Sequence, residues 1–431
     1  MNPAEVGGET GNLLEHLFRR QSGRMVAHLV RRFGPSRLDL AEEAVQGAML
    51  RALQTWPYHG VPDNPEGWLF RVAQNLAIDA LRRDRRSTDP LDFELPDPSA
   101  PGDADFEEQF RDDELRMILM CSHPELSRDA SVALSLKIAG GLSGREIARA
   151  FLADVSTIEQ RIVRAKRQIR ERGLTLAMPA GADFDSRLDS VIEVLYLIFN
   201  EGYAAHEGED LIRRDLCFEA LRLAQLVASS SLAASSSRAP RLDALLAVMA
   251  LQAARLPARV DEAGDLILLE DQDRSRWDPR LIALGFHHFE KSMTGGEVSE
   301  YHVQAAIAAT HARANALHST DWPAILELYD QLFAINPSPV VALNRAVAVA
   351  KVHGAARGLA AIAPLENDTR EPKGVMRDYY LFLAVRGHLL LELGRSAEAA
   401  ACFRAALDLR CSEPERRFLR RKLAEATNRS A

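Results

Sequence analysis

The sequence predicts an all-α protein of two or three domains. Its 431 residues exceed what one hydrophobic core holds, because single cores stop growing at roughly 250–300 residues. Only 6% of the residues are aromatic, while 47% are hydrophobic and alanine, leucine and arginine recur throughout. That composition favours helices over a β-sandwich or barrel. With 26% charged residues, the chain is typical of a folded protein and not of a disordered one.

The composition also excludes several classes of protein. The four cysteines are Cys121, Cys217, Cys402 and Cys411. They are scattered without a C-x-x-C pair, which argues against a disulfide framework or a zinc ribbon. The N-terminus carries acids where a signal peptide needs a basic region, and no stretch approaches the roughly 18 apolar residues of a membrane helix. No nucleophile–base pair, phosphate loop or metal-ligand spacing emerges. We therefore expect a cytoplasmic protein that is not an enzyme and uses no membrane segment, metal or cofactor.

Charge is segregated along the chain. The net charge of −8 argues against a protein that coats nucleic acid, but residues 82–86 and 159–172 are strongly basic. Residues 87–110 contain acids and no lysine or arginine. Because this acidic stretch also contains four prolines, we expect a linker without regular structure over residues 89–110. Local fields of this kind govern nucleic-acid binding more than the sum of charges does.

The N-terminal block, residues 10–88, is predicted to be helical. Helices are expected from about residue 12 to 86, with breaks at Gly34-Pro35 and over residues 57–62. Apolar side chains recur at helical spacing over residues 39–56, and Asp39 can cap that helix. A further helix starts near Pro65, since a first turn tolerates proline.

A second helical block, residues 111–175, leads through a spacer at 179–183 into a helical remainder over 186–431. The remainder contains two imperfect copies of a small/large pattern, at 321–352 and 393–409, which predict stacked tetratricopeptide-like helix pairs. Within it we expect a flexible loop at 229–237 and a short strand at 265–269.

The strongest motif is a helix–turn–helix pattern over residues 142–166. Ser143 can cap a short helix and Ser156 a longer one, whose Ile158 and Ile162 point inward. Residues at the start of the second helix then meet base edges, and later cations meet phosphates. An ordinary helical hairpin with a solvated basic face is the alternative.

A second motif runs from Trp68 to Arg86. Asn75 and Asp79 are four residues apart and so share a helix face that ends in a run of arginines. Polar groups beside cations suit single-stranded or melted DNA. A solvated helix end, with arginines favoured by the helix dipole, explains the same pattern.

Together, these motifs resemble an extracytoplasmic-function sigma factor of the sigma-70 family. Residues 41–52 are similar to the helix that docks on the polymerase clamp, 65–86 to the element that melts and reads the −10 element, and 142–170 to region four, which reads the −35 element. The remainder resembles the subgroup with a large C-terminal extension containing tetratricopeptide repeats. Gly47 departs from the family, which usually has an acid there, and costs the helix about 1 kcal/mol.

The resemblance implies three sets of site residues. Those implied to bind polymerase are Asp39, Glu42, Glu43, Gln46, Met49 and Leu50. Those implied to bind the −10 element are Trp68, Arg71, Asn75, Asp79, Arg82, Arg83, Arg85 and Arg86. Those implied to bind the −35 element are Ser156, Thr157, Gln160, Arg161, Arg164, Lys166 and Arg167.

The expected function is that of a promoter-specificity subunit of RNA polymerase, with core polymerase and promoter DNA as partners. We expect the extension to modulate the sigma half in cis, and also consider it a platform for a protein partner. Candidates for its docking surface are Asn200, Glu201, Tyr203, Asp271, Asp273 and Arg274, unless these form hydrogen-bonded turns inside the extension. Two alternatives are a helix–turn–helix regulator with a repeat-type sensor domain, and a scaffold of repeats.

Overall fold

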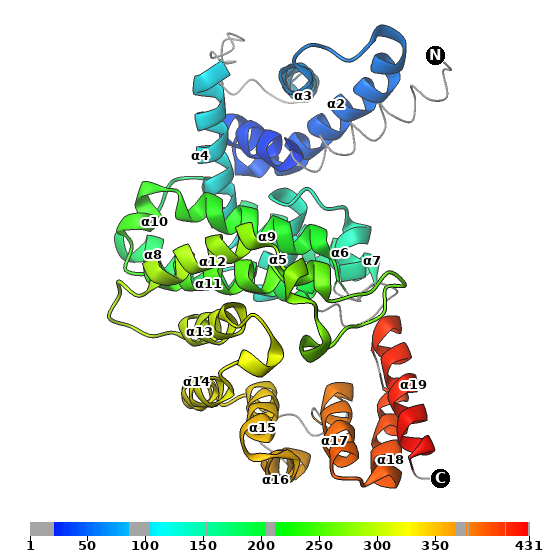
Figure 1. The fold of residues 1–431 in the computed structure, drawn as a ribbon. Coiled ribbons are helices and arrows are strands. Elements are labelled where there is room, and N and C mark those ends of the chain that lie inside the picture. The colour runs from blue at the N-terminus through cyan, green and yellow to red at the C-terminus, as the bar shows by residue number, and fades with distance from the viewer. Residues whose placement is uncertain are drawn as a thin grey trace. The chain divides into compact units, whose positions relative to one another are not determined.

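The computed structural model describes residues 21–85, 103–150, 154–203, 212–367, 376, 379–409 and 411–429. Over these residues the chain is all-α, as predicted: it forms helices and one isolated antiparallel bridge between Val260 and Leu266, and no β-strand (Figure 1). Two compact units divide the chain, Met1–Val194 and Leu195–Ala431. The boundary between them falls inside helix α8, Gly181–Tyr203.

The first unit begins with a helix over residues 21–33, the 3-10 turn η1 (Pro35–Arg37), α2 (Leu38–His59) and α3 (Pro65–Arg85). Gly34 separates the first helix from η1 at φ 91°, a conformation that glycine adopts without strain. Helices α2 and α3 pack together so closely that a Cβ at Gly47 would lie 2.9 Å from Leu76 Cδ1. A side chain at position 47 would therefore require the end of the Leu76 side chain to move.

Helix α4 (Asp103–Cys121) corrects the predicted linker, because residues 103–110 are helical. Phe110 is buried, with its ring centroid 5.3 Å from that of Phe70. Three residues later Asp113 is fully buried, accepts from Arg31 Nη1 at 2.7 Å and lies 2.8 Å from His28 Nδ1. These long-range contacts explain why a stretch with a linker's composition is helical at its end. Residues 89–102 of the predicted linker lie outside the described residues.

Helices α5 (Arg128–Ile138), α6 (Gly144–Ala150) and α7 (Val155–Glu171) complete the first unit with the start of α8. Helix α7 begins one residue before the predicted cap: its N-cap is Asp154, and Ser156 lies inside the first turn. The predicted spacer at 179–183 is likewise helical from Gly181 onward. The bounds predicted for the four domains stay predictions.

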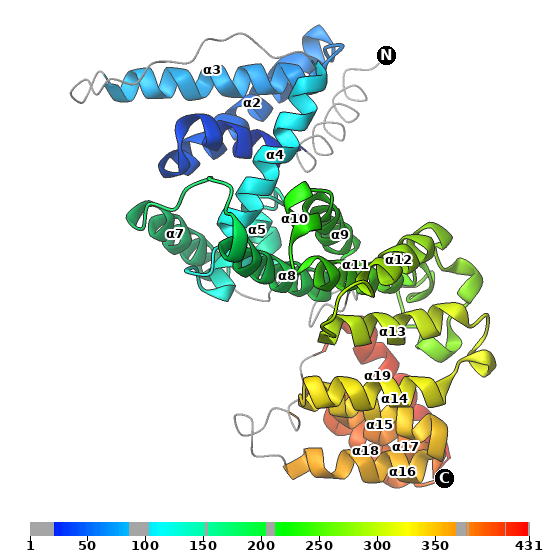
Figure 2. The same cartoon turned by 90° about the vertical axis from the view of Figure 1, so that its left-hand side faces the viewer.

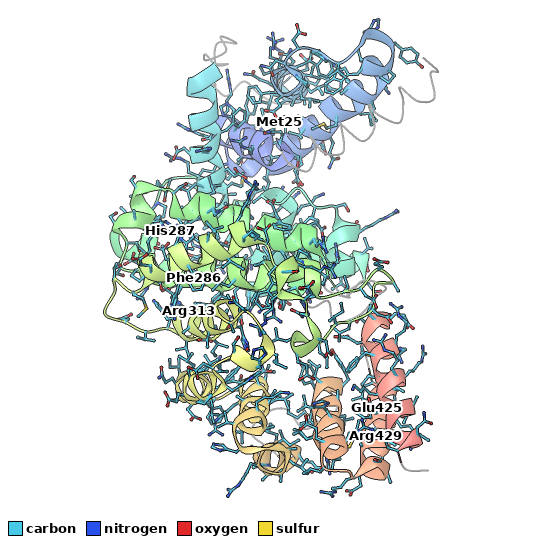
Figure 3. The ribbon with its side chains drawn as sticks, viewed as in Figure 1. Met25, Phe286, His287, Arg313, Glu425 and Arg429 are labelled. Atoms are coloured by element: carbon cyan, nitrogen blue, oxygen red, sulfur yellow. The ribbon has the colours of Figure 1, made fainter. Side chains whose placement is uncertain are left out.

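The second unit is built around α11 (Ala239–Ala253), which is buried on nearly all sides. Helices α12 (Pro279–Ser292) and α13 (Glu300–Arg313) pack on it, beside α9 (Arg214–Ala228). The Arg313 guanidinium lies over the Phe286 ring, 5.5 Å from its centroid, and thereby joins α13 to α12 (Figure 3).

Two local predictions for this unit are wrong. The serine-rich stretch at 229–237 contains the short helix α10 (Ser231–Ser235), whose N-cap Ser230 accepts from the backbone N–H of Ala233 at 3.2 Å. At 265–269 there is no strand, but only the bridge from Val260 to Leu266 and the start of the turn η3 (Leu269–Asp271).

The remaining helices pack mostly against their neighbours in sequence (Figures 1 and 2): α14 (Trp322–Ile335), α15 (Pro339–His353), α16 (Ala355–Ile362), α17 (Tyr380–Glu392), α18 (Ser396–Leu407) and α19 (Glu413–Asn428). A Cβ at Gly387 would lie 2.8 Å from Phe403, so glycine allows α17 and α18 to approach closely. Stacking of helix pairs is consistent with a repeat, but the tetratricopeptide-like nature stays a prediction.

None of the described helices is long and apolar enough to cross a membrane. Nor do the described histidines, cysteines and acids gather in a group of three that could hold a metal ion. All four cysteines are buried free thiols.

Candidate nucleic-acid and polymerase interfaces

Helix α7 separates a buried face from an exposed one. Ile158, Ile162, Ala165 and Ile169 recur at three- and four-residue intervals and are buried. On the outer face, the predicted −35 contacts Ser156, Gln160, Arg164 and Arg167 are exposed. Arg167 pairs at 3.5 Å with Glu171, a contact between two exposed side chains that phosphate can replace at small cost.

The other predicted −35 residues are less available in this structure. Arg161 is half-buried and pairs with Asp129 of α5 at 3.1 Å, and Thr157 is half-buried at the start of the helix. Lys166 turns away from the exposed face altogether. Helical spacing identifies the faces of α7, but it does not reveal which neighbouring acids already hold its cations.

Lys166 belongs to an ion cluster that joins α7 to α2 and that comprises Asp39, Glu42, Lys166 and Arg170. Lys166 Nζ donates to Asp39 Oδ1 at 2.7 Å and also to Glu42 Oε2. Arg170 Nη1 lies 3.5 Å from Asp39 Oδ2. The Lys166 and Glu42 side chains are only 13% and 11% exposed. Burial lowers the pKa of Lys166, but the two carboxylates outweigh it and the pKa is raised, which keeps the ammonium charged.

This cluster brings together residues from two predicted interfaces. Asp39 and Glu42 were assigned to polymerase, and Lys166 to promoter phosphate. In this conformation Lys166 and Glu42 are largely buried against each other, whereas Asp39 pairs with Lys166 but stays 52% exposed.

The rest of the predicted polymerase surface lies on the outer face of α2. Glu43, Gln46 and Leu50 are exposed, with Leu50 at 57%. Met49 is wrong as a contact residue, because it is 7% exposed and packs in the core. Sequence reasoning missed Leu53, which is 48% exposed and three residues from Leu50. The three-residue spacing, which places Leu50 and Leu53 on the same face of α2, could have identified it from the sequence.

Helix α3 presents the predicted −10 residues along one face. Arg71, Asn75 and Asp79 follow at four-residue intervals, and all three are exposed. Arg82 and Arg83 extend the exposed face, and Arg82 Nη1 lies 3.8 Å from Asp79 Oδ1. Trp68 is half-buried, its ring centroid 5.5 Å from that of Trp56, so it supports α2 as well as bordering the surface. The side chain of Arg85 and the whole of Arg86 lie outside the described residues.

Two of the predicted docking residues in the extension form turns. Arg274 is half-buried, and its Nη1 donates at 2.6 Å to the carbonyls of His311 and Ala314, so its role in docking stays a prediction. Asp273 caps the turn η4 (Arg274–Arg276) through the Ser275 N–H.

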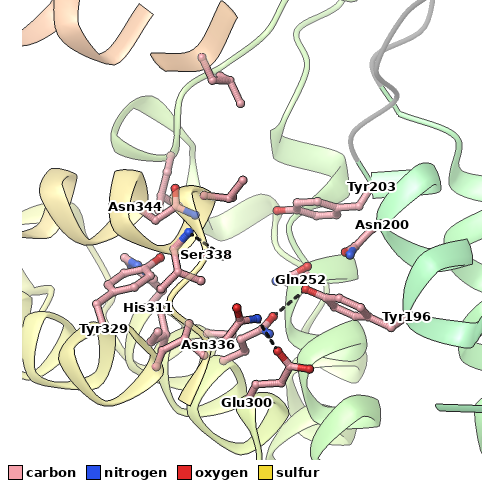
Figure 4. A pocket seen from close by; sticks show the side chains of 18 of the residues that line it. Tyr196, Asn200, Tyr203, Gln252, Glu300, His311, Tyr329, Asn336, Ser338 and Asn344 are labelled. Carbon is pink, nitrogen blue, oxygen red and sulfur yellow. Dashed lines mark hydrogen bonds between the residues drawn. The ribbon is translucent and has the colours of Figure 1, made fainter. Parts of the chain in front are cut away.

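The other docking candidates differ in exposure. Asp271 is exposed and Glu201 is half-buried. Asn200 and Tyr203 line a cavity within the second unit (Figure 4).

Comparison with known sequence families gives three matches. Residues 18–87 match Sigma-70 region 2, and residues 116–169 match Sigma-70, region 4. Residues 187–293 match a family of unknown function, DUF6596. The first two matches cover α2, α3 and α7, and the third covers the start of the extension.

A similar protein is the uncharacterized protein R00370 of Rhizobium meliloti (strain 1021). It is 40% identical over 396 residues, which cover 90% of each chain. No solved structure gives a significant match.

Proposed function

Since the chain belongs to the extracytoplasmic-function sigma factors of the sigma-70 family, with a C-terminal extension, we propose how its surfaces serve promoter-specific transcription. Members of this family are transcription initiation factors whose partners are core RNA polymerase and promoter DNA. In our proposal α2 docks on core polymerase, α3 holds the melted −10 strand, α7 reads the −35 element, and the extension modulates these steps in cis.

The observation that carries this proposal is a pair of exposed polar faces on the two matched regions. One is formed on α3 by Arg71, Asn75 and Asp79, and the other on α7 by Gln160 and Arg164. A regulator that binds duplex DNA by itself needs the second face but not the first. Two separate faces suit a protein that contacts a promoter at two elements.

The α3 face suits single-stranded DNA because it mixes hydrogen-bonding groups with cations. Asn75 offers an amide that can donate and accept, and Asp79 accepts from exocyclic amines. Arg71, Arg82 and Arg83 can hold the backbone. The face of α2 around Leu50 and Leu53 instead offers exposed leucines beside Glu43 and Gln46, which suits a protein partner.

Run-off transcription with purified core polymerase tests the proposal. We expect transcription from a cognate promoter, and we expect Asn75→Ala with Asp79→Ala to reduce open-complex formation without weakening core-polymerase binding. Permanganate footprinting of thymines near the start site measures melting, and gel filtration with core polymerase measures docking. The matched control is Arg111→Ala, which removes an exposed polar side chain on α4, outside both proposed surfaces.

Two results would contradict the proposal. Absence of polymerase-dependent transcription, with retained binding to duplex DNA, would favour the regulator. Unchanged melting in the double variant, together with lost polymerase binding, would show that α3 serves docking instead of the −10 strand.

A further inference from the structure

The second unit contains an open cavity of about 610 Å³ whose lining is rich in tyrosine and amide side chains (Figure 4). It lies between the C-terminal part of α8, α11 and α13 on one side and α14, α15 and α17 on the other. Cavities of roughly 300–1,000 Å³ suit small organic ligands. The chain has only seven tyrosines, and five of them line this cavity: Tyr196, Tyr203, Tyr329, Tyr379 and Tyr380.

Arg255 supplies the cavity with a cation that no acid neutralises among the described residues. Its Nε lies 3.4 Å from Gln272 Oε1, and its guanidinium lies over the Trp277 ring, 5.5 Å from the centroid. Burial lowers the pKa of Arg255, because the charge is poorly hydrated there. A poorly hydrated guanidinium without a carboxylate is a strong site for an anion.

The acids that line the same cavity already have donors. Glu300 Oε2 accepts from Asn336 Nδ2 at 2.8 Å. Glu415 accepts from the Ser412 N–H at 2.8 Å and from the Tyr380 hydroxyl. Because these donors are neutral, Glu300 and Glu415 keep their negative charge, but among the described residues no ion pair joins either of them to Arg255. The Arg255 guanidinium therefore lacks a carboxylate partner in this part of the structure.

His311 provides a second, independent indication of a ligand. Its side chain lines the cavity and is 7% exposed, and its buried Nδ1 has no hydrogen-bond partner among the described residues. Burial, with the nearby charges of Arg255 and Arg274, lowers the pKa of His311 to about 3, so the ring is neutral at physiological pH. A buried nitrogen without a partner costs free energy that a bound polar group would recover.

We infer that this cavity binds a small aromatic carboxylate. The carboxylate pairs with Arg255, the ring lies among the tyrosines, and polar substituents reach His311 or the amides of Asn336 and Asn344. Tyrosine rings favour an aromatic ring over an aliphatic chain, since ring pairs gain energy beyond the area that they bury. The inference does not depend on the polymerase-directed function.

Isothermal titration calorimetry of the full chain with 4-hydroxybenzoate tests the inference, and the uncharged 4-hydroxybenzamide is the matched probe. We expect saturable binding of the carboxylate and at least about tenfold weaker binding of the amide, because a hydrogen bond to a charged group is lost. Arg255→Gln should weaken carboxylate binding by at least about tenfold as well. Arg276→Gln, which removes an exposed arginine that does not line the cavity, should bind like the natural chain.

Gln252→Glu keeps the test decisive if Arg255→Gln does not fold. Gln252 and Arg255 both line the cavity and are three residues apart at the end of α11, where the backbone N–H of Arg255 donates to the backbone carbonyl of Gln252 at 3.1 Å. A carboxylate at this position should compete for the guanidinium and weaken binding of the probe. Three results would overturn the inference. They are the absence of saturable 4-hydroxybenzoate binding, equal binding of the amide and the carboxylate, and unchanged affinity in whichever of the two variants folds. Binding of an extended peptide in place of the carboxylate would overturn it as well.

Discussion

Gln160 and Arg164 lie on the same exposed face of α7, yet their positions predict different effects on DNA binding. Gln160 is in the second turn, near the helix start that meets base edges, and Arg164 lies one turn further along. Arg164→Gln should weaken binding to every promoter and flatten the salt dependence by about one unit of slope. Gln160→Ala should instead change the preference among −35 sequences. Promoter binding by the polymerase complex, measured over a range of salt concentrations, separates the two effects.

A matched control is available on α4. Arg111 is exposed there and should leave both the salt dependence and the sequence preference unchanged when replaced by glutamine. If Arg164→Gln behaves like Arg111→Gln, α7 does not contact promoter phosphates.

His311 predicts that the second unit loses stability in mild acid. Its pKa is about 3 in the folded chain and 6.5 in its ordinary state, so the unfolded chain binds the additional proton between these values. Stability is therefore fully present above pH 6.5 and is lost as the pH falls towards 3. Between pH 7 and 5 the loss from this residue is about 2 kcal/mol. Hydrogen exchange of α13 amides at both pH values measures it.

His302 should act in the same direction, since burial also lowers its pKa. His311→Asn should remove the His311 share of the pH dependence, whereas His318→Asn, at an exposed position, should leave it intact. An equal pH dependence in both variants would show that folding does not lower the pKa of His311.

At the level of single residues, the exposed and buried faces of a helix were easier to predict from the sequence than the side chains that pair with each other. The exposed positions of α3 and α7 follow from helical spacing, because that spacing also explains the buried Ile158 and Ile162. Lys166, Met49 and Arg274 could not be assigned in this way. Their contacts are made with Glu42, with the core of the first unit and with the carbonyls of His311 and Ala314, which are remote in sequence.

At the level of elements, the α2–α7 ion cluster predicts a coupling between stability and polymerase docking. Lys166→Met leaves the largely buried Glu42 with only Lys137 Nζ, 4.0 Å away. We expect the free energy of unfolding to fall by roughly 3 kcal/mol, as for a broken buried pair. Arg167→Met on the same helix breaks an exposed pair and should cost about 1 kcal/mol or less. Urea unfolding of both variants provides the comparison.

The same variant tests whether the cluster restrains docking. Without Lys166, Asp39 keeps only the 3.5 Å contact with Arg170 and Glu42 the 4.0 Å contact with Lys137 among the described residues. Both acids are then held less strongly, so Lys166→Met should bind polymerase more tightly in the absence of DNA. Weaker binding than that of the natural chain would mean that the cluster supports the docking surface.

Element boundaries were predictable where a residue enforces them locally. Pro65 starts α3 and Gly34 ends the first helix, because their backbone preferences act without help from other segments. Composition failed at α4 and α10. The acids of residues 103–110 suggested a linker, but Phe110 is held by Phe70, whose position in sequence gives no hint of the contact.

At the level of the whole molecule, the position of the unit boundary determines how the extension can be removed. A cut at Met178, before α8, would also remove Phe184, Leu188 and Val191, which belong to the first unit and are buried. It would break the contact of Arg128 Nη2 with Glu193 Oε2, at 2.8 Å, as well. A chain ending at Val194 keeps these residues and is the better test of the extension.

We expect this shortened chain to bind core polymerase but to differ from the full chain in run-off transcription. Helix α8 is the physical reason, since it carries Leu188 and Val191 of the first unit and Tyr196 and Asn200 of the cavity in the second. A change at the cavity can therefore alter a helix that the sigma half shares. Adding residues 195–431 as a separate chain should restore the full-chain yield only at high concentration, because covalent linkage supplies a high effective concentration. Equal transcription by the two chains, with no binding between the separate halves, would leave the extension as a platform for another protein.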